Sequence, residues 1–511
     1  MEDAELGNDA PTVDTPSGRL RGTRVVARDV AIGVWKGIPY AEPPIGDRRF
    51  APPVPAEPWV GIRDAGSYGP IAVQAPSAIV VPGEEQSEDC LTLNVWAPEG
   101  GSDLPVMVWF HGGSFVSGSA STLWYDGARL ASRGVIVVTV NYRLGPLGFL
   151  HLEPLGGEGF AGSATAGIAD QGESLRWVRD HIGAFGGDRS NVTIFGESAG
   201  AMSVSTHLAY PSSAGLFRRA IAQSGAARHV HGYEDGEQIA AQVMEVLGVD
   251  RAHPERLRHL PASAFVEVQG LVRPPDGAEL PLAFAPTVDG ASLPIAPLLA
   301  IGAGSSAGVD LVVGSNLDEM NFFILLAQLS GQLGPIDDDR LRRHLGRAVD
   351  ALGVARSPDD VIATYRRRLG DATPGEVWSA IATDLVFGVP AMALADAHRD
   401  HGSVRSYLYT HRSTGFDGAL GSAHVMEIPF VFDNTGARGV RFLNGEIDDR
   451  RREFAGRLAD AWVSFAASGD PSTPELGPWP EVGPARTTMV LDIASRPVDD
   501  PQGDERRIWY P

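Results

Sequence analysis

Short apolar segments rich in β-branched residues recur along the chain, and stretches with helical periodicity separate them. The predicted strands are residues 91–98, 104–110, 135–142, 191–195, 220–225, 310–316 and 403–409. A helix is predicted over 168–185, where Ile168, Leu175, Val178 and Ile182 share one face. Because strands that are apolar on both faces must be covered on both sides, this alternation predicts an α/β fold with a large, mostly parallel central sheet flanked by helices.

The first 60 residues follow a different pattern. The stretches VDTPSGRLRGTRVV (13–26) and AIGVWKGIPYAEPP (31–44) combine short alternating runs with Gly and Pro turns. They predict short antiparallel strands in a small N-terminal sheet beside the main one.

Two acidic, loop-rich tracts, near 228–300 and 330–380, interrupt the alternation of strands and helices. We expect them to be helical insertions that form a lid or the wall of a gorge. The chain contains no internal repeat and no low-complexity linker. All 511 residues are therefore expected to form a single domain, 1–511.

The chain carries 64 acidic and 42 basic residues, which gives a formal net charge of −22. This surplus repels polyanions, so we expect no nucleic acid and no membrane among the partners. The N-terminal stretch lacks the basic patch and apolar run of a secretory signal, and no segment reaches the roughly 18 apolar residues of a membrane span. We therefore expect a cytoplasmic protein.

The single cysteine, Cys90, excludes an intramolecular disulfide and a cysteine-rich metal site. It stands at the start of an alternating strand pattern, which is typical of a buried structural thiol rather than of a nucleophile. We expect no cofactor and no bound metal.

The segment NVTIFGESAGAMSV (191–204) places Ser198 between a predicted strand and a predicted helix. Gly196 and Gly200 remove the side chains that would crowd a strained turn, and such a turn would expose the serine hydroxyl above the sheet. The N–H of Ala199 would lie at the helix N-terminus, where unpaired donors favour developing negative charge. This context favours a nucleophile over a purely structural turn.

A second Gly-x-Ser-x-Gly match shows how weak the pattern is by itself. GSSAG (304–308) fits it, but the match precedes a predicted strand instead of following one. Its serine, Ser306, would not be raised at a strand-to-helix turn. Strand and helix context is therefore what distinguishes Ser198 from Ser306.

A serine hydroxyl needs a base and an orienting carboxylate, which on this type of fold follow in the order Ser, acid, His. Asp318 and Glu319 come just after a predicted strand, and spacing does not decide between them. His424 lies in a Gly/Ser loop after the last predicted strand. The other downstream histidines are poorer candidates, because they lie in charged helical stretches or flank a strand: His344, His398, His401 and His411.

An acyl-transfer site also needs donors for an oxyanion, and the segment MVWFHGGSFVSGS (107–119) can supply them. In it a predicted strand is followed by glycines that let backbone N–H groups approach a ligand closely. The alternative is a glycine turn that merely ends the strand. The presence of the serine turn elsewhere in the chain favours the functional interpretation.

These segments resemble the blocks of the type B carboxylesterase and cholinesterase family of α/β-hydrolases, in the family's order and over nearly the whole chain. The matching blocks are KGIPYAEPPIGDRRFAPP (36–53), SEDCLTLNVWAP (87–98), WFHGGSFVSGS (109–119), NYRLGPLGFL (141–150), DQGESLRWVRDHIGAFGGDRSNVTIFGESAGA (170–201), LFRRAIAQSGA (216–226) and HVMEIPFVF (424–432). Together they are very specific.

The resemblance implies an α/β-hydrolase fold and a serine hydrolase that cleaves carboxylic esters through an acyl-enzyme. It assigns Ser198 as nucleophile, Glu319 as acid and His424 as general base. It assigns the oxyanion donors to Gly113, Ser114 and Ala199. Gly112, Glu197 and Ser224 resemble supporting residues near the triad, although a merely structural role stays open for the last two.

Two departures from the family are visible. Where the family often has a cysteine that pairs with the SEDC cysteine, this chain has Ala72, which leaves Cys90 unpaired and suits an intracellular enzyme. The connecting loop, residues 75–89, has no aromatic residue of the kind with which cholinesterases hold a quaternary ammonium group. A choline ester specialist is therefore not expected.

The expected partner is a small-molecule ester, with broad small, aryl or alkyl esters as substrates, and the expected assembly is a monomer or weak oligomer. Carbamate or amide hydrolysis by the same triad is the alternative, since the acyl-enzyme chemistry does not depend on the leaving atom. A non-catalytic cholinesterase-like adhesion module is the remote alternative, because such modules tend to lose the serine or histidine. The run with Phe322 and Phe323 is expected to line a substrate pocket or to belong to the core.

Overall fold

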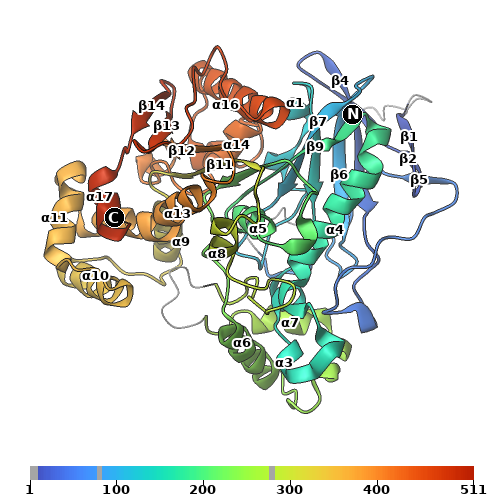
Figure 1. Cartoon of the computed structure of the whole chain (residues 1–511), viewed down its shortest axis with the longest axis horizontal. Helices are drawn as coiled ribbons and strands as arrows, with labels where there is room; N and C mark the ends of the chain where they lie inside the picture. The colour runs from blue at the N-terminus through green and yellow to red at the C-terminus, as the bar shows by residue number, and fades with distance from the viewer. Residues whose placement is uncertain (1–9, 77–82, 275–281, 511) are drawn as a thin grey trace.

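The computed structural model describes residues 10–76, 83–274 and 282–510, and a large twisted sheet crosses its centre (Figure 1). The main sheet has 11 strands in the order β14-β13-β12-β11-β10-β9-β7-β8-β6-β4-β3. Its strands are β3 (Thr23–Ala27), β4 (Val30–Pro39), β6 (Thr92–Pro98), β7 (Leu104–Phe110), β8 (Ile136–Val140), β9 (Gly187–Glu197), β10 (Arg219–Gln223), β11 (Asp310–Asn316), β12 (Val404–Tyr409), β13 (Thr487–Leu491) and β14 (Arg496–Asp499). From β8 to β13 neighbouring strands are parallel, which confirms the predicted fold class.

The prediction for the first 60 residues was partly wrong. A small sheet does exist, formed by β1 (Thr12–Thr15), β2 (Gly18–Arg21) and β5 (Ile62–Asp64). However, β3 and β4 pair antiparallel with each other and extend the main sheet through β6. The sequence pattern of β4 predicts a strand, but it does not indicate whether that strand belongs to the small sheet or to the main sheet. The last two strands, β13 and β14, were not predicted, and they pair antiparallel at the other edge.

Two groups of helices cover the two faces of the sheet. Successive residues of β7 alternate between two cores, with Val106 and Val108 in one and Met107 and Trp109 in the other. The first core includes residues of α4 (Ala166–His181) and α5 (Ala199–His207), and the second includes residues of α1 (Ala128–Ala131), α14 (Ile428–Val431) and α16 (Asp449–Ser468). The predicted helix 168–185 corresponds to α4 and the short 3-10 helix that follows it.

Half of the remaining α-helices of the described chain lie in or at the ends of the two tracts that were predicted as insertions. The first tract contains α6 (Tyr233–Val246), α7 (Ala262–Val268) and α8 (Pro297–Gly302), with residues 275–281 outside the described part. The second contains α10 (Asp338–Leu352), α11 (Pro358–Leu369) and most of α12 (Pro374–Thr383). Other helices are α2 (Gly145–Phe149), α3 (Glu153–Gly156), α9 (Met320–Leu329), α13 (Val389–His398), α15 (Val440–Asn444) and α17 (Gly503–Trp509). In Figure 1 the pair α10 and α11 lies at the periphery, away from the sheet.

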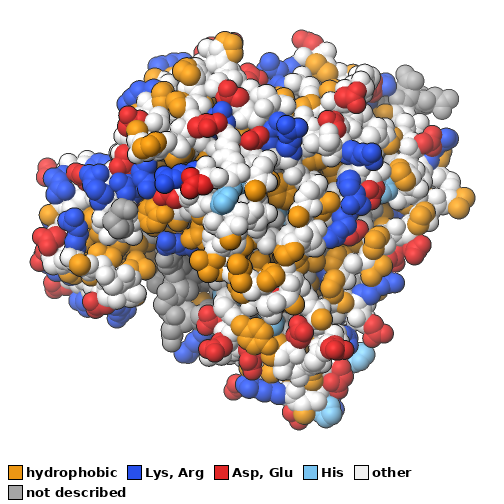
Figure 2. Space-filling view, viewed as in Figure 1, with side chains coloured by type: hydrophobic (Ala, Val, Ile, Leu, Met, Phe, Trp, Pro, Cys, Tyr) orange, Lys and Arg blue, Asp and Glu red, His pale blue; other side chains and the backbone are white. Residues whose placement is uncertain are grey.

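One helix in the described part of the chain, Pro374–His398, is long and apolar enough to cross a membrane, with a mean hydropathy of 1.6. The sequence analysis predicted no such segment. The helix is 89% buried inside the protein over that window, as expected of a core helix. On the face seen in Figure 2, acidic and basic side chains are intermixed and apolar ones gather near the centre.

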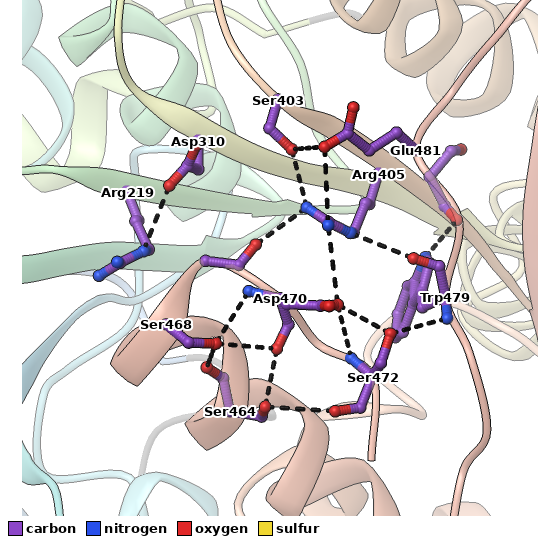
Figure 3. A network of polar contacts seen from close by, with 12 residues as sticks. Arg219, Asp310, Ser403, Arg405, Ser464, Ser468, Asp470, Ser472, Trp479 and Glu481 are labelled. Atoms are coloured by element: carbon purple, nitrogen blue, oxygen red, sulfur yellow. Dashed lines mark hydrogen bonds and ion pairs between the residues drawn. The ribbon is translucent and has the colours of Figure 1, made fainter.

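Polar contacts fix the edge of the sheet at which β12 begins. Arg405 of β12 donates hydrogen bonds to the carbonyl oxygens of Trp479 (3.1 Å) and Gly469 (2.9 Å), which ties the strand to the end of α16 (Figure 3). Beside it, Arg219 of β10 lies 3.4 Å from Asp310 of β11. Near the amino ends of these strands, one contact therefore joins β10 to β11, and the other two join β12 to the segment after α16.

A buried ion pair fixes the loop after β8. The Arg143 guanidinium donates to both carboxylate oxygens of Asp170 in α4, at 2.8 and 2.6 Å. The Arg143 N–H also donates to this carboxylate, at 3.1 Å, and both side chains are almost fully buried. Removing one charge would leave the other buried and uncompensated, which is costly.

We therefore expect Asp170→Asn to lower the free energy of unfolding by about 3 kcal/mol. The matched control is Asp180→Asn on the same helix, because Asp180 pairs with Arg179 at the surface, where both side chains are about half exposed. That change should cost less than about 1 kcal/mol. Urea unfolding of both variants measures the difference, and equal losses would contradict a special role for the buried pair.

Candidate active site

The turn between β9 and α5 holds Ser198 in a backbone conformation that is rare for a residue with a side chain. Its φ is 57° and its ψ is −125°. The N–H of Ser198 donates to the carbonyl of Gln223 at the end of β10, at 2.9 Å. The predicted strand-to-helix turn is therefore present, although β9 begins earlier than predicted.

Neighbouring backbone makes glycine necessary on both sides of the serine. A Cβ atom on Gly200 would lie 2.0 Å from the carbonyl oxygen of Phe110, the last residue of β7. A Cβ on Gly196 would lie 2.5 Å from the carbonyl carbon of Gly200. The lack of side chains at both glycines allows β7, β9 and α5 to approach each other this closely.

The acid and the histidine come from loops after two further strands. Glu319 follows β11, and His424 lies in the long connection between β12 and α14. The Nδ1–H of His424 donates to Oε2 of Glu319 at 2.6 Å, while the N–H of Asn316 donates to Oε1 at 2.7 Å. Both side chains are buried, so the carboxylate holds the imidazole ring in one orientation.

Asp318, which spacing could not separate from Glu319, makes different contacts. Its carboxylate accepts a hydrogen bond from the N–H of Ser422 at 2.9 Å and lies 3.4 Å from the Arg412 guanidinium. Its own N–H donates to the carbonyl of Ser422 at 3.0 Å. Asp318 therefore holds the histidine loop, whereas Glu319 contacts the histidine itself.

Ser198 and His424 line one cavity of about 460 Å³. The structure brings together at this cavity the following predicted residues: Gly112, Gly113, Ser114, Glu197, Ser198, Phe322, Phe323 and His424. Among the contacts of the described residues, Ser198 Oγ and His424 Nε2 form no hydrogen bond. Nε2 instead lies 3.1 Å from Oε1 of Glu197, without hydrogen-bond geometry.

Three buried glutamates surround the His424 imidazole. Burial lowers the pKa of His424, but Glu197 and Glu319 outweigh this effect and raise it to about 9. Burial raises the pKa of Glu197 well above its ordinary value and also raises that of Glu427. The site is thus built to favour a positive charge on the histidine.

Sequence analysis missed Glu427 and the groups that hold it. Its carboxylate accepts hydrogen bonds from the amides of Asn316 (2.7 Å) and Gln223 (3.2 Å), and the Trp462 indole donates to Gln223 at 3.0 Å. The signal was present, because Glu427 is a lone acid in the apolar run VMEIPFVF, three residues after His424. Asn316 has no such signal, since it is simply the last residue of β11.

Aromatic rings pack against the same histidine. The rings of Phe323 and Phe387 each lie 4.9 Å from the His424 ring, and Phe322 lies 6.4 Å away. Phe387 belongs to a π-helical turn, Asp384–Gly388, between α12 and α13. Such single turns often occur at functional sites.

The glycine loop after β7 is also strained. Gly113 has a φ of 117°, and Ser114 and Phe115 have values of 55° and 60°. A Cβ on Gly113 would lie 2.1 Å from the carbonyl oxygen of Ser117. In the described chain the N–H groups of Gly113 and Ser114 donate no hydrogen bond, and both residues line the cavity. Ala199 begins α5, so its N–H is among those that a helix leaves unpaired.

The remaining candidates lie as follows. Ser224 is fully buried just after β10, with a φ of 53°, and its N–H donates to the carbonyl of Gly314. Ser306 lies in the turn before β11, away from any strand-to-helix turn, and hydrogen-bonds with His398 at 3.0 Å. The second nitrogen of His398 contacts the Val309 carbonyl instead of a carboxylate. This pair therefore lacks the acid that accompanies His424.

Cys90 is buried, and burial raises the pKa of its thiol, which opposes reactivity. Cys90 and Ala72 line the same small cavity. Ala72, which stands where the family often has the partner cysteine, is therefore a neighbour of Cys90. Of the loop that lacks an aromatic residue, 77–82 lie outside the described residues.

Comparison with known proteins matches residues 9–509 to the carboxylesterase family. The chain is 37% identical to the para-nitrobenzyl esterase of Bacillus subtilis over 508 residues, 98% of each chain. It is 34% identical to the phenmedipham hydrolase of Pseudarthrobacter oxydans, over 92% of each chain. Among solved structures, a Geobacillus stearothermophilus carboxylesterase superposes with a TM-score of 0.85 at 36% identity, covering 98% of this chain and 99% of that one.

The contact at Gly200 predicts an unusual response to alanine. Glycine to alanine within a helix normally stabilises a protein by about 0.5–1 kcal/mol. Gly200→Ala should instead destabilise the protein, because the added methyl group meets the Phe110 carbonyl. The control is Gly172→Ala in α4, where the added Cβ would have only ordinary contacts at 3.7 Å and beyond. The midpoint temperature of thermal unfolding should fall for Gly200→Ala and should not fall for Gly172→Ala. A higher midpoint for Gly200→Ala would contradict the packing described.

Proposed function

This chain belongs to the carboxylesterase family, and we propose that Ser198, His424 and Glu319 are the catalytic triad with which it hydrolyses carboxylic esters. The observation that carries the assignment is their convergence at the carboxyl ends of β9, β11 and β12. There the strained serine and the carboxylate-bound histidine line one cavity. The activity itself is that of a carboxylic ester hydrolase, and its substrates are small-molecule esters.

In the proposed first step, His424 Nε2 accepts the proton of Ser198 while Oγ attacks the acyl carbonyl. His424 Nε2 lies next to the Glu197 carboxylate. For the proton transfer, Nε2 must move away from Glu197 and form a hydrogen bond with the Ser198 hydroxyl. Glu319 keeps the ring oriented and stabilises the imidazolium that forms. The carbonyl oxygen then becomes an oxyanion.

The N–H groups of Gly113, Ser114 and Ala199 are proposed to bind this oxyanion. The unpaired donors of the glycine loop and the first N–H of α5 support this assignment, since such donors stabilise charge that develops in the transition state. The donor at Ser114 is its backbone N–H, which any residue except proline can supply.

His424 then protonates the leaving alcohol, and the acyl group remains on Ser198. Water, deprotonated by the same His424, attacks the acyl-enzyme and releases the acid. Gly112, Glu197 and Ser224 are proposed to support the triad and its loops. Gly112 tolerates no side chain, since a Cβ there would lie 2.8 Å from the Glu197 carbonyl oxygen.

We further propose a single domain over 1–511, a monomer or weak oligomer, and a cytoplasmic location. The unpaired, buried Cys90 supports a reducing compartment. Among the described residues that line the substrate cavity, none belongs to the two insertions, so the predicted gorge wall is formed by α9 and by loops instead.

Ser198→Ala should lower kcat for a short-chain aryl ester by several orders of magnitude without unfolding the protein. The matched control is Ser306→Ala in the second Gly-x-Ser-x-Gly segment, which should keep wild-type activity. Steady-state rates and circular dichroism of both variants provide the measurement. Retained activity in Ser198→Ala would refute the assignment.

The raised pKa of His424 predicts a pH profile. Only the neutral imidazole can accept the serine proton, so kcat/KM should rise with pH through the His424 pKa, toward about 9. Glu197→Gln removes a negative neighbour that raises this pKa, so the midpoint should move to lower pH. A midpoint that stays in place, whatever the change in maximal rate, would show that Glu197 does not act on the charge of His424.

A further inference from the structure

Helix α9 has an apolar composition but no buried residue. Eight of its ten residues, in the sequence MNFFILLAQL, are apolar. None of the ten, all of which the structure describes, is buried, and the side chains of Leu326 and Leu329 are 43% and 67% exposed. Helices of this composition normally belong to a core, so the exposure of α9 requires a reason.

The helix is fixed at its first turn. The Met320 N–H donates to the Thr383 hydroxyl at 3.1 Å, and the Asn321 side chain accepts a hydrogen bond from Ser379 at 2.6 Å. This turn follows Glu319 directly, so the start of α9 is held beside the catalytic acid. The later turns of α9 are therefore exposed although the start of the helix is firmly held.

One face of α9 leads from the catalytic histidine toward solvent. Phe322, Leu326 and Leu329 have the i, i+4, i+7 spacing of residues on one helical face. Phe322 lies 6.4 Å from His424, and both Phe322 and Leu326 line the cavity that contains Ser198. Leu329 extends the face beyond the cavity, and at 1.5 Å per residue the three positions span about 10 Å.

A second exposed apolar side chain lines this cavity. Leu123, 44% exposed, lines the same cavity as Leu326. The apolar surface is thus continuous with the place where the ester bond must lie. This continuity points to a part of the substrate as its occupant.

Two other occupants fit less well. The net charge of −22 opposes docking to an anionic lipid surface. A second copy of the chain would need roughly 800 Å² on each side for a stable interface, far more than the side chains of one helical stripe provide.

We propose that the face formed by Phe322, Leu326 and Leu329 binds a linear alkyl chain of the substrate as it leaves the catalytic cavity. This inference rests on the proposed function and defines its substrate class, which is esters with a long apolar chain. The chain can belong to the acyl group or to the alcohol. In either case, longer chains cover more of the stripe and remove more apolar surface from water.

The test compares two series of esters, each kept below its critical micelle concentration. p-Nitrophenyl esters from acetate to decanoate vary the acyl chain, and alkyl acetates from ethyl to decyl vary the alcohol. We expect kcat/KM to rise at least tenfold along one series, mainly through a lower KM, and the responding series identifies the side that α9 binds. A flat or falling profile in both series would overturn the proposal.

The variant Leu329→Asn should reduce the ratio of long-chain to short-chain kcat/KM by about tenfold in the responding series. Its control is Leu352→Asn, at the end of α10, which is exposed and does not line the cavity. This control should keep both values. An unchanged ratio in Leu329→Asn would count against a bound substrate chain.

The two levels of the proposal fail in distinguishable ways. If no ester of either series is cleaved, the proposed function is wrong. If acetate esters are cleaved by a Ser198-dependent route but chain length has no effect, only the role of α9 is wrong. Sedimentation at assay concentration adds a third readout, since self-association that Leu329→Asn abolishes would assign the stripe to a second copy and overturn the inference.

Discussion

The site depends first on how closely β7 and β9 approach the start of α5. The Phe110 carbonyl of β7 occupies the space that a side chain at Gly200 would need, and Gly196 meets Gly200 in the same way. This packing forces the chain to turn sharply at Ser198. A strained residue persists only where its surroundings over-determine it, and here the sheet does so. The position of the proposed nucleophile is thus a consequence of strand packing.

Electrostatics provide the second constraint, because three carboxylates and one imidazole are buried together. An unpaired buried charge is costly. Here amide donors and the histidine ring stabilise the buried carboxylates. Glu427 is held by Asn316 and Gln223, and Glu319 accepts from the Asn316 N–H. Asn316 therefore links two acids through its backbone and its side chain. The resting cluster favours the charge that forms on His424 when it accepts a proton.

Much of this arrangement could be predicted from the sequence, since glycines and strand order reflect local constraints. Ser198 and His424 were identified from such signals, and the structure places both at one cavity. What could not be predicted depends on contacts between distant segments. The edge of the sheet that β3 and β4 join is one example, and the link from Asn316 to Glu427, 111 residues apart, is another. The burial pattern of α9 is a third, because its composition alone predicts a core helix.

These constraints fall on different parts of the chain, and this separates catalysis from selectivity. The ends of the strands hold Ser198, Glu319 and the proposed oxyanion loop. At the glycines there, even an added methyl group would clash with backbone atoms. The outer part of the cavity is formed by α9 and by loops between strands, whose side chains are partly exposed. Substitutions there change the surface that a substrate chain contacts, and they leave the packing of the sheet unchanged. The exposed leucines of α9 can therefore persist beside the strained, buried residues of the proposed triad, since the two groups are stabilised by different contacts.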